Sequence, residues 1–160
     1  MNHLRRIVQR INRLPQRLRP WVLSRAFGHT IPFTASAGVR VVELGTRKAM
    51  LCLPNRRRAR NHIGTIHATA TALLAESATG ILLAMHVDDD CVPVLKSLHV
   101  DYLRRSQGAL QATATLDSAS IDFIRTHEHG EISVPVAVTD AAGQSPVQAQ
   151  LLWAWVPRRQ

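Results

Sequence analysis

Glu76 is the residue best suited to chemistry, because it is the one acidic residue in the apolar segment NHIGTIHATATALLAESATG at 61–80. A helix that is apolar on nearly all sides is expected to be buried. The residues one helical turn away offer no charge to pair with it; they are Ala72, Leu73, Thr79 and Gly80. Burial without a partner raises the pKa of a carboxyl group, and such a group in a cleft is a candidate general base or nucleophile. The alternative is that Glu76 lies where the helix reaches an edge and contacts water.

His67 lies nine residues before Glu76, near the start of the same helix. At about 1.5 Å and 100° per residue, nine residues span roughly 13.5 Å and half a rotation. The two side chains therefore cannot meet at one substrate atom within one chain, although they could across a twofold axis between subunits. The helix start also offers backbone N–H groups that suit a developing oxyanion. A purely structural role for the ring of His67 is the alternative.

The elements that must position these residues follow from the hydrophobic periodicity. We expect one long apolar helix over about 66–86 and a small helical insert at 118–129. The expected strands are 38–45, 48–54, 92–103, 109–117, 131–140 and 146–156, with the last two paired as a hairpin. In the first strand, Val39, Val41 and Glu43 are expected on one face and Leu44 on the other. One long helix and about six strands predict an α+β fold in which the sheet curls around the helix.

The spacing of Asn61, Gly64, His67 and Glu76 resembles the signature of hot-dog fold thioesterases. The closest likeness is to the phenylacetyl-CoA thioesterase-like group, whose pattern runs Asn-x-x-Gly-x-x-His-Gly-Gly, followed by an Asp or Glu on the helix. The later stretch HVDYLRRSQGALQATATL resembles the strand pair that follows the helix in that family. The resemblance covers roughly residues 30–157. The amino-terminal helix and the insert at 118–129 resemble an uncharacterised branch of the same superfamily.

This resemblance implies a hot-dog fold, in which a curved antiparallel sheet wraps one long helix and two subunits join their sheets edge to edge. A homodimer or a dimer of dimers is expected, with the active sites at the subunit interface. Glu76 would be the base that activates water, or the nucleophile that attacks the thioester. Asn61 would orient the water or substrate, and the backbone N–H groups near His67 and Ala68 would polarise the carbonyl oxygen. No cofactor and no metal are expected.

Substrate binding is assigned, by the same resemblance, to Gly64 and Thr69 and to arginines that could contact the phosphates of coenzyme A. These arginines are Arg56, Arg57, Arg58, Arg104 and Arg105. One departure from the family pattern concerns activity, since Ala68-Thr69 stands where the family usually has Gly-Gly. Glycine allows close backbone approach to the thioester, and a side chain could obstruct it. Thr69 or Thr65 could supply a hydroxyl instead, or simply cap the helix start.

The amino-terminal segment is strongly basic and is expected to form an arm, residues 1–29, beside a single hot-dog domain at 30–160. Leu4, Ile7, Val8 and Ile11 follow helical spacing, and the arginines between them make this a basic amphipathic helix stopped by Pro15 and Pro20. Its apolar stripe could dock on the body, or it could attach to an anionic membrane surface or partner. No signal peptide is recognisable, and the two cysteines fit a reducing compartment, so a cytoplasmic location is expected.

Three functions compete on this evidence. The first is a thioesterase acting on acyl-CoA or acyl-carrier-protein thioesters through Glu76. The second is a non-catalytic hot-dog module that binds an acyl thioester or lipid, which Ala68-Thr69 favours. The third is a nucleic-acid-binding protein, suggested by the net charge of +9 and the pI near 11.3. It is the weakest, because aromatic residues make up only 4% of the chain and no DNA-reading motif is recognisable.

Overall fold

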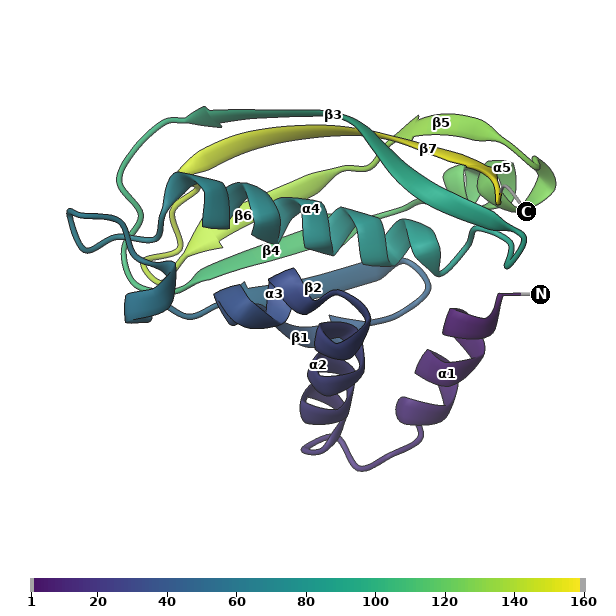
Figure 1. Ribbon diagram of the computed structural model, residues 1–160, viewed down its shortest axis with the longest axis horizontal. Coiled ribbons are helices and arrows are strands. Elements are labelled where there is room, and N and C mark those ends of the chain that lie inside the picture. The colour runs from purple at the N-terminus through teal and green to yellow at the C-terminus, as the bar shows by residue number, and fades with distance from the viewer. Residues whose placement is uncertain (1, 159–160) are drawn as a thin grey trace.

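The computed structural model describes residues 2–158, which form five α-helices, one short 3-10 helix and seven β-strands (Figure 1). The helices are α1 (His3–Ile11), α2 (Arg19–Thr30), α3 (Pro32–Ala37), α4 (Ala68–Ala84) and α5 (Ser118–Thr126), with the 3-10 helix η1 (Arg57–Ala59). The strands are β1 (Arg40–Leu44), β2 (Lys48–Leu53), β3 (Cys91–Tyr102), β4 (Leu110–Thr115), β5 (Gly130–Ser133), β6 (Val136–Asp140) and β7 (Val147–Pro157). The predicted α+β class is confirmed.

The strands form two antiparallel sheets, one in the order β1-β2-β4-β6 and one in the order β3-β7-β5. The sequence predicted about six strands and a single strand at 131–140. That strand is divided at Pro135, which has no N–H to donate to a ladder. Before it, the N–H of Val134 donates to the carbonyl of Leu151 on β7 (3.2 Å), whereas the carbonyl of Pro135 itself accepts from the N–H of Thr115, the last residue of β4 (3.1 Å). The chain thus crosses from one sheet to the other, so β6 pairs with β4 and not with β7.

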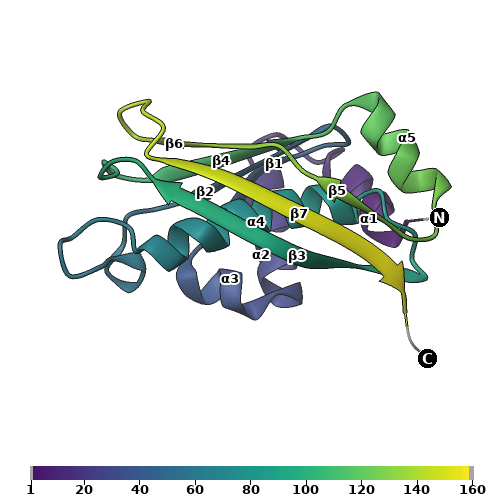
Figure 2. The ribbon, with the colours of Figure 1, turned by 90° about the horizontal axis from the view of Figure 1, so that it is seen from above.

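Helix α4 packs against strands of both sheets, and Figure 1 shows it with β3 and β7 on one side and β2 and β4 on the other. In Figure 2, β3 and β7 run side by side across α4. Leu74, Ala78, Leu82 and Leu83 of α4 are completely buried. This burial explains why the helix carries almost no charge, because a charge on either side would face the interior.

The first strand differs from the prediction by a β-bulge. The pairing of β1 with β2 shifts register between Val41 and Glu43. An extra residue on one strand changes which side chains share a face. As a result Val41 and Leu44 are both buried, whereas Glu43 is exposed and contacts Lys48 at 2.7 Å.

The segment predicted as the amino-terminal arm, residues 1–29, contains α1 and nearly all of α2 and not one helix alone, and α3 follows directly after it. Pro20 does not end the helical region, because it lies in the first turn of α2, where its missing N–H leaves no intrahelical bond unmade. The arm is attached to the body by polar contacts as well as by buried apolar residues. Asn12 Nδ2 donates to the carbonyl of Leu44 (2.8 Å), and Ser24 Oγ accepts from the N–H of Val41 on the edge strand (2.9 Å).

Candidate active site

Glu76 lies near the middle of α4, half-buried in the wall of a cavity of about 590 Å³. That volume is within the usual range for small-molecule sites, about 300–1,000 Å³. Helices α1, α2 and α3 form one side of the cavity, and α4, β3 and Trp153 of β7 form the other. Among the described residues that line it, Glu76 is the only charged one, and the other lining residues include Ile7, Phe27 and Leu73. The cavity therefore combines an apolar lining with a single carboxylate.

Burial raises the pKa of Glu76 above its ordinary value. Within residues 2–158, no side chain or backbone group donates a hydrogen bond to its carboxylate or forms an ion pair with it. A carboxylate with a raised pKa is a stronger base than one in water, and one without a partner keeps its lone pairs available. These are the properties required of a general base or nucleophile.

Trp153 of β7 forms part of the cavity wall, and it contacts α4 about one helical turn after Glu76. Its indole N–H donates to Thr79 Oγ1 (3.0 Å), and its ring lies against Gly80. A Cβ atom at Gly80 would approach the ring to 2.7 Å, which is closer than real Cβ contacts. The absence of a side chain at position 80 therefore allows the indole to lie directly on the helix.

His67 is the N-cap of α4, and its ring has a structural role there. Its Nδ1 accepts a hydrogen bond from the N–H of Thr69 (3.1 Å), so the proton of the neutral ring lies on Nε2. The N–H of His67 itself donates to the carbonyl of Ala59 (2.8 Å). These contacts occupy the backbone amides of residues 67 and 69. In the described part of the chain, the amides of Ala68 and Ala70 remain to polarise a carbonyl oxygen near the helix start, and Ala68 is the one that the sequence pattern indicated.

Asn61 organises the loop before α4. Its Oδ1 accepts from the N–H groups of Ile63 and Thr65, both at 3.1 Å, and its Nδ2 donates to Thr65 Oγ1 (2.9 Å). Gly64 lies inside this turn with φ +80°, in the left-handed region that favours glycine. In the single chain, the amide of Asn61 therefore holds its own turn.

The arginines predicted to bind phosphate lie in and around the loops at the end of the molecule where α4 begins (Figure 1). Arg58 lies over Gly38, where a Cβ atom would come within 2.7 Å of its Nη2. Arg104 Nη1 donates to Gln144 Oε1 (2.9 Å). Arg56, Arg57 and Arg105 are exposed.

One chain distributes the predicted site residues among three cavities. Glu76 lines the large apolar one, whereas Arg58, His67 and Thr69 line a second cavity of about 240 Å³. A third, of about 330 Å³, is lined by residues that include Asn61, Ala68, Arg104 and Arg105. Gly64, Arg56 and Arg57 line none of the three. Within one chain, the start of α4 and Glu76 therefore line different cavities. This agrees with the expectation from their spacing of nine residues, which places them about half a rotation apart on the helix.

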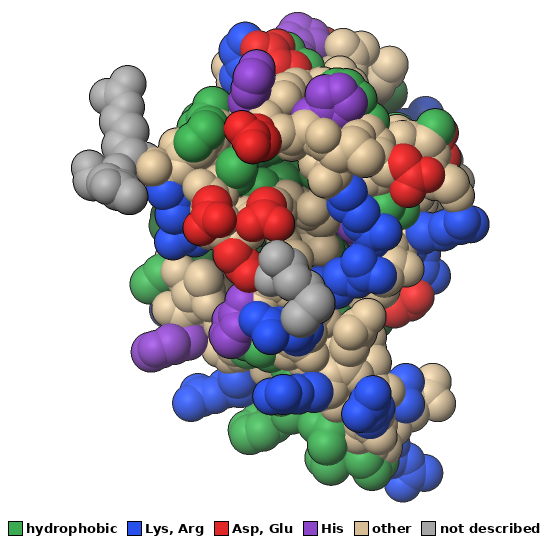
Figure 3. Space-filling model, turned by 90° about the vertical axis from the view of Figure 1, so that its right-hand side faces the viewer, with side chains coloured by type: hydrophobic (Ala, Val, Ile, Leu, Met, Phe, Trp, Pro, Cys, Tyr) green, Lys and Arg blue, Asp and Glu red, His purple; other side chains and the backbone are tan. Residues whose placement is uncertain are grey.

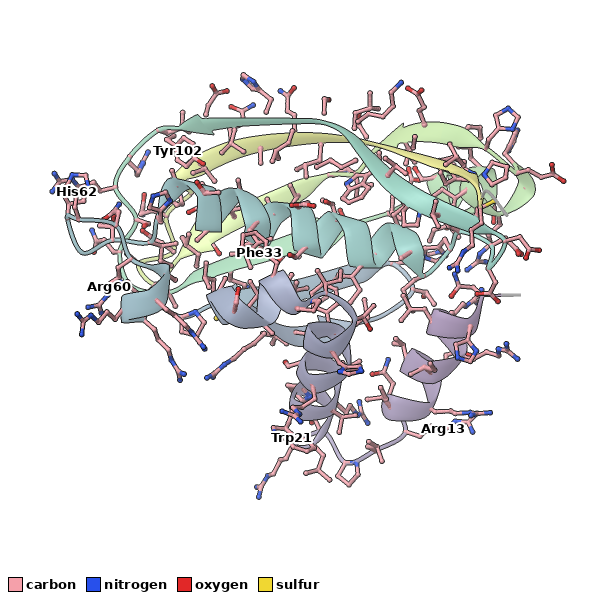
Figure 4. All side chains as sticks on the ribbon, viewed as in Figure 1. Arg13, Trp21, Phe33, Arg60, His62 and Tyr102 are labelled. Carbon is pink, nitrogen blue, oxygen red and sulfur yellow. The ribbon has the colours of Figure 1, made fainter. Side chains whose placement is uncertain are left out.

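Two residues of this region carry roles that the sequence did not indicate. Phe33 of α3 lines both the Glu76 cavity and the His67 cavity, and it is labelled beside α4 in Figure 4. Tyr102, at the end of β3, donates its hydroxyl to the carbonyl of Ala68 (2.7 Å), joining the strand to the helix start. The only available signal for Tyr102 was that it is the single tyrosine of the chain. Nothing in the local sequence places Phe33 between two cavities.

The described part of the chain has neither of two other kinds of feature, a metal site and a membrane-spanning helix. Residues 2–158 contain no group of three or more His, Cys, Asp or Glu side chains arranged to hold a metal ion. None of the helices described is long and apolar enough to cross a membrane.

Residues 19–156 match the family model of a domain of unknown function, DUF4442. The chain belongs to the DUF4442 family. The match includes α2 and α3 as well as the two sheets and α4, so most of the Glu76 cavity lies within the family's domain. A search of curated proteins finds no match to this DUF4442 chain.

Solved structures share its fold. A Pseudomonas aeruginosa protein of unknown function, described as a probable thioesterase, is 25% identical, with a TM-score of 0.77 and coverage of 91% of this chain and 97% of that one. A thioesterase family protein from Silicibacter pomeroyi is 14% identical, with a TM-score of 0.66 and coverage of 84% and 96%. A thioesterase from Haemophilus influenzae is 14% identical, with a TM-score of 0.63 and coverage of 78% and 82%. The resemblance to the hot-dog fold thioesterase superfamily is confirmed.

Proposed function

We propose that this protein is a thioester hydrolase acting on acyl-CoA or acyl-carrier-protein thioesters, with Glu76 as its general base or nucleophile. The observation that carries the proposal is the unpaired carboxylate of Glu76, held half-buried in a mostly apolar cavity with no other charged residue in its described lining. An aliphatic acyl chain matches the apolar lining, since each methylene buried there contributes about 0.8 kcal/mol. Only the reacting thioester needs a polar group, and Glu76 supplies it.

In the general-base route, the carboxylate of Glu76 takes a proton from water as the water oxygen bonds to the thioester carbonyl carbon. The resulting oxyanion collapses, the carbon–sulfur bond breaks, and the thiolate leaves and takes up a proton. A free carboxylic acid and a thiol are the products. A positioned general base contributes about 10²–10⁴-fold to such a reaction. A backbone donor to the oxyanion contributes about 10²–10³-fold, and the amide of Ala68 is the one proposed here.

The amide of Ala68 would come from a second subunit. Strand β3 is 12 residues long and pairs with β7 on one edge. In the part of the chain that is described, nothing pairs with its other edge, and Val94, Leu98 and Tyr102 of this strand have exposed side chains. Joining two such edges in a homodimer would cover these side chains and could bring one subunit's helix start to the other's Glu76. Arg104 and Arg105, with Arg56, Arg57 and Arg58, would then be the contacts for phosphates of coenzyme A.

A second candidate function is a non-catalytic module that binds an acyl thioester in the same cavity. Thr69 favours it, because the N–H of this residue is already bonded to the ring of His67 and cannot serve an oxyanion. Ala68 and Thr69 also carry side chains where the related pattern has glycine. Turnover separates the two functions, because both require acyl binding and only the first releases thiol.

The test is thiol release from a series of saturated acyl-CoA substrates of increasing chain length, comparing wild type with Ala84→Phe. Ala84 lines the cavity two helical turns beyond Glu76, about 12 Å along the axis. A phenyl group there fills the far end of the cavity, so kcat/KM for the longest substrates should fall by about fourfold for each methylene excluded. Activity on the shortest substrates should be unchanged.

Ala119→Phe is the matched control, because Ala119 is exposed on α5 and is not part of the cavity lining. It should leave the chain-length profile unchanged. If Ala84→Phe lowers kcat/KM equally for short and long substrates, the acyl chain does not occupy this cavity. If wild type binds the substrates but releases no thiol, the non-catalytic function replaces the proposed one.

A further inference from the structure

The first 42 residues contain eight arginines and no acidic residue; the first carboxylate in the chain is Glu43. Positive charge over α1 and α2 is not needed to hold the arm in place. The body is contacted by apolar side chains of α1 and α2, including Val8, Ile11 and Leu23, which are all buried. The exposed arginines of the arm, such as Arg10, Arg13 and Arg17, are therefore available to an external partner of negative charge.

Hydrophobic side chains are exposed where the arm turns from α1 into α2. Leu14 is 36% exposed, Leu18 50% and Trp21 66%. We call these three residues the apolar tip. Figure 4 labels Trp21 and Arg13 at the lower end of the arm, on the side away from β3 and β7. In Figure 3, hydrophobic side chains gather at the bottom of the molecule with lysine or arginine side chains around them.

The apolar tip is held in a defined conformation. Arg19 Nε donates to the carbonyl of Leu14 (2.7 Å), and the N–H of Leu18 donates to the carbonyl of Pro15 (2.9 Å). Asn12, just before this turn, is bonded to Leu44 of the body. The exposure of three large apolar side chains is therefore a property of the folded arm.

We propose that the apolar tip docks on an anionic membrane surface. Trp21 and Leu18 would enter the interface between headgroups and acyl chains, where tryptophan is favoured. Arg10, Arg13 and Arg17, which are exposed beside the tip, would contact lipid phosphates. A protruding apolar end surrounded by cations suits a bilayer better than a nucleic acid, whose backbone is contacted by cationic grooves. This docking is independent of whether Glu76 catalyses a reaction.

The test uses the full-length protein with vesicles of phosphatidylcholine, either pure or mixed with phosphatidylglycerol. Co-sedimentation should occur with the mixed vesicles and be weak with the neutral ones. Tryptophan emission should shift to shorter wavelength on binding. Because Trp153 and Trp155 are buried already, the shift reports Trp21. Trp21→Phe should abolish the shift and retain the emission of the two buried tryptophans, which shows that the variant is folded.

Two pairs of arginine substitutions distinguish binding through the apolar tip from a general attraction of the basic protein to anionic lipid. Arg13→Gln with Arg17→Gln should weaken partitioning by about 25-fold, at roughly fivefold for each arginine near an anionic surface. Arg60→Gln with Arg158→Gln removes the same charge from exposed positions on the body and should have little effect.

Leu18→Ser with Trp21→Ser should weaken binding by roughly tenfold or more. Val156→Ser, at an exposed apolar position on β7, is its control and should leave binding unchanged. Equal losses from the two arginine pairs would overturn the proposal, as would binding that survives Leu18→Ser with Trp21→Ser. Displacement from the mixed vesicles by duplex DNA, with the Trp21 shift lost, would overturn it in favour of a nucleic-acid surface.

Discussion

His86 gives a quantitative prediction about stability and pH. It follows α4, is 3% exposed, and its Nε2 lies 2.6 Å from the carbonyl of Thr46. Its Nδ1 lies 3.0 Å from Arg125 Nη2, which can only donate. The ring is therefore neutral, with its proton on Nε2. Burial lowers the pKa of His86 to about 4; the bond to Thr46 opposes this, and the charges of Arg125 and Arg5 add to it.

The size of the effect follows from the two pKa values. In the unfolded chain a histidine has a pKa of about 6.5. Because the folded pKa is lower, the unfolded state binds the proton first as pH falls, so stability is fully present above about pH 6.5 and is lost toward pH 4. A difference of about 2.5 pKa units corresponds to a loss of about 3 kcal/mol, at 1.36 kcal/mol per unit.

The assay is urea unfolding at intervals from pH 7 to pH 4, comparing wild type with His86→Gln. A glutamine amide can donate to Thr46 and accept from Arg125, and it does not titrate. Carboxyl groups titrate in both proteins, so their contributions cancel in the difference. We expect wild type to lose about 3 kcal/mol more than His86→Gln across this range. Parallel curves for the two proteins would refute the assignment of a buried, neutral His86.

Three further predictions concern the site. Glu76→Gln should raise the Tm at neutral pH, because the raised pKa of Glu76 means that its ionisation disfavours the folded state above the ordinary carboxyl pKa; a lower Tm would contradict this. Gly80→Ala should destabilise by about 1–3 kcal/mol in urea unfolding, since its methyl group would overlap Trp153; an unchanged midpoint would show that the indole moves freely. Tyr102→Phe should cost about 0.5–1 kcal/mol through the lost bond to Ala68, and a neutral result would mean that water replaces it.

Much of the fold could be predicted because local pattern and final burial agree. The apolar segment containing Leu74 and Leu82 is buried between two sheets, as a helix with no polar face requires. Two features could not be predicted because they depend on pairing. Alternation alone does not reveal that the segment 131–140 is divided at Pro135 into two strands that pair in different sheets. It also does not reveal the bulge in β1 that leaves both Val41 and Leu44 buried.

The part of the site that could be predicted is the residue whose charge differs from its apolar surroundings. Glu76 was identified because a carboxylate in an apolar helix is costly, and the structure places it beside a cavity. The cavity itself was not predictable, since it is completed by helices α1 to α3, far away in sequence. The roles of Asn61 and His67 in holding the loop and capping α4 depend on hydrogen-bond geometry, which residue spacing alone does not give.

The most direct test of the central proposal is kcat/KM for thiol release from the best acyl-CoA substrate, measured for wild type and Glu76→Gln under the same conditions. Glutamine keeps the size of the side chain and removes its ability to accept a proton or attack the carbonyl. We predict a fall of about 10²–10⁴-fold, with substrate binding retained. Equal rates for the two proteins, or no turnover by wild type, would contradict the proposal that Glu76 hydrolyses a thioester.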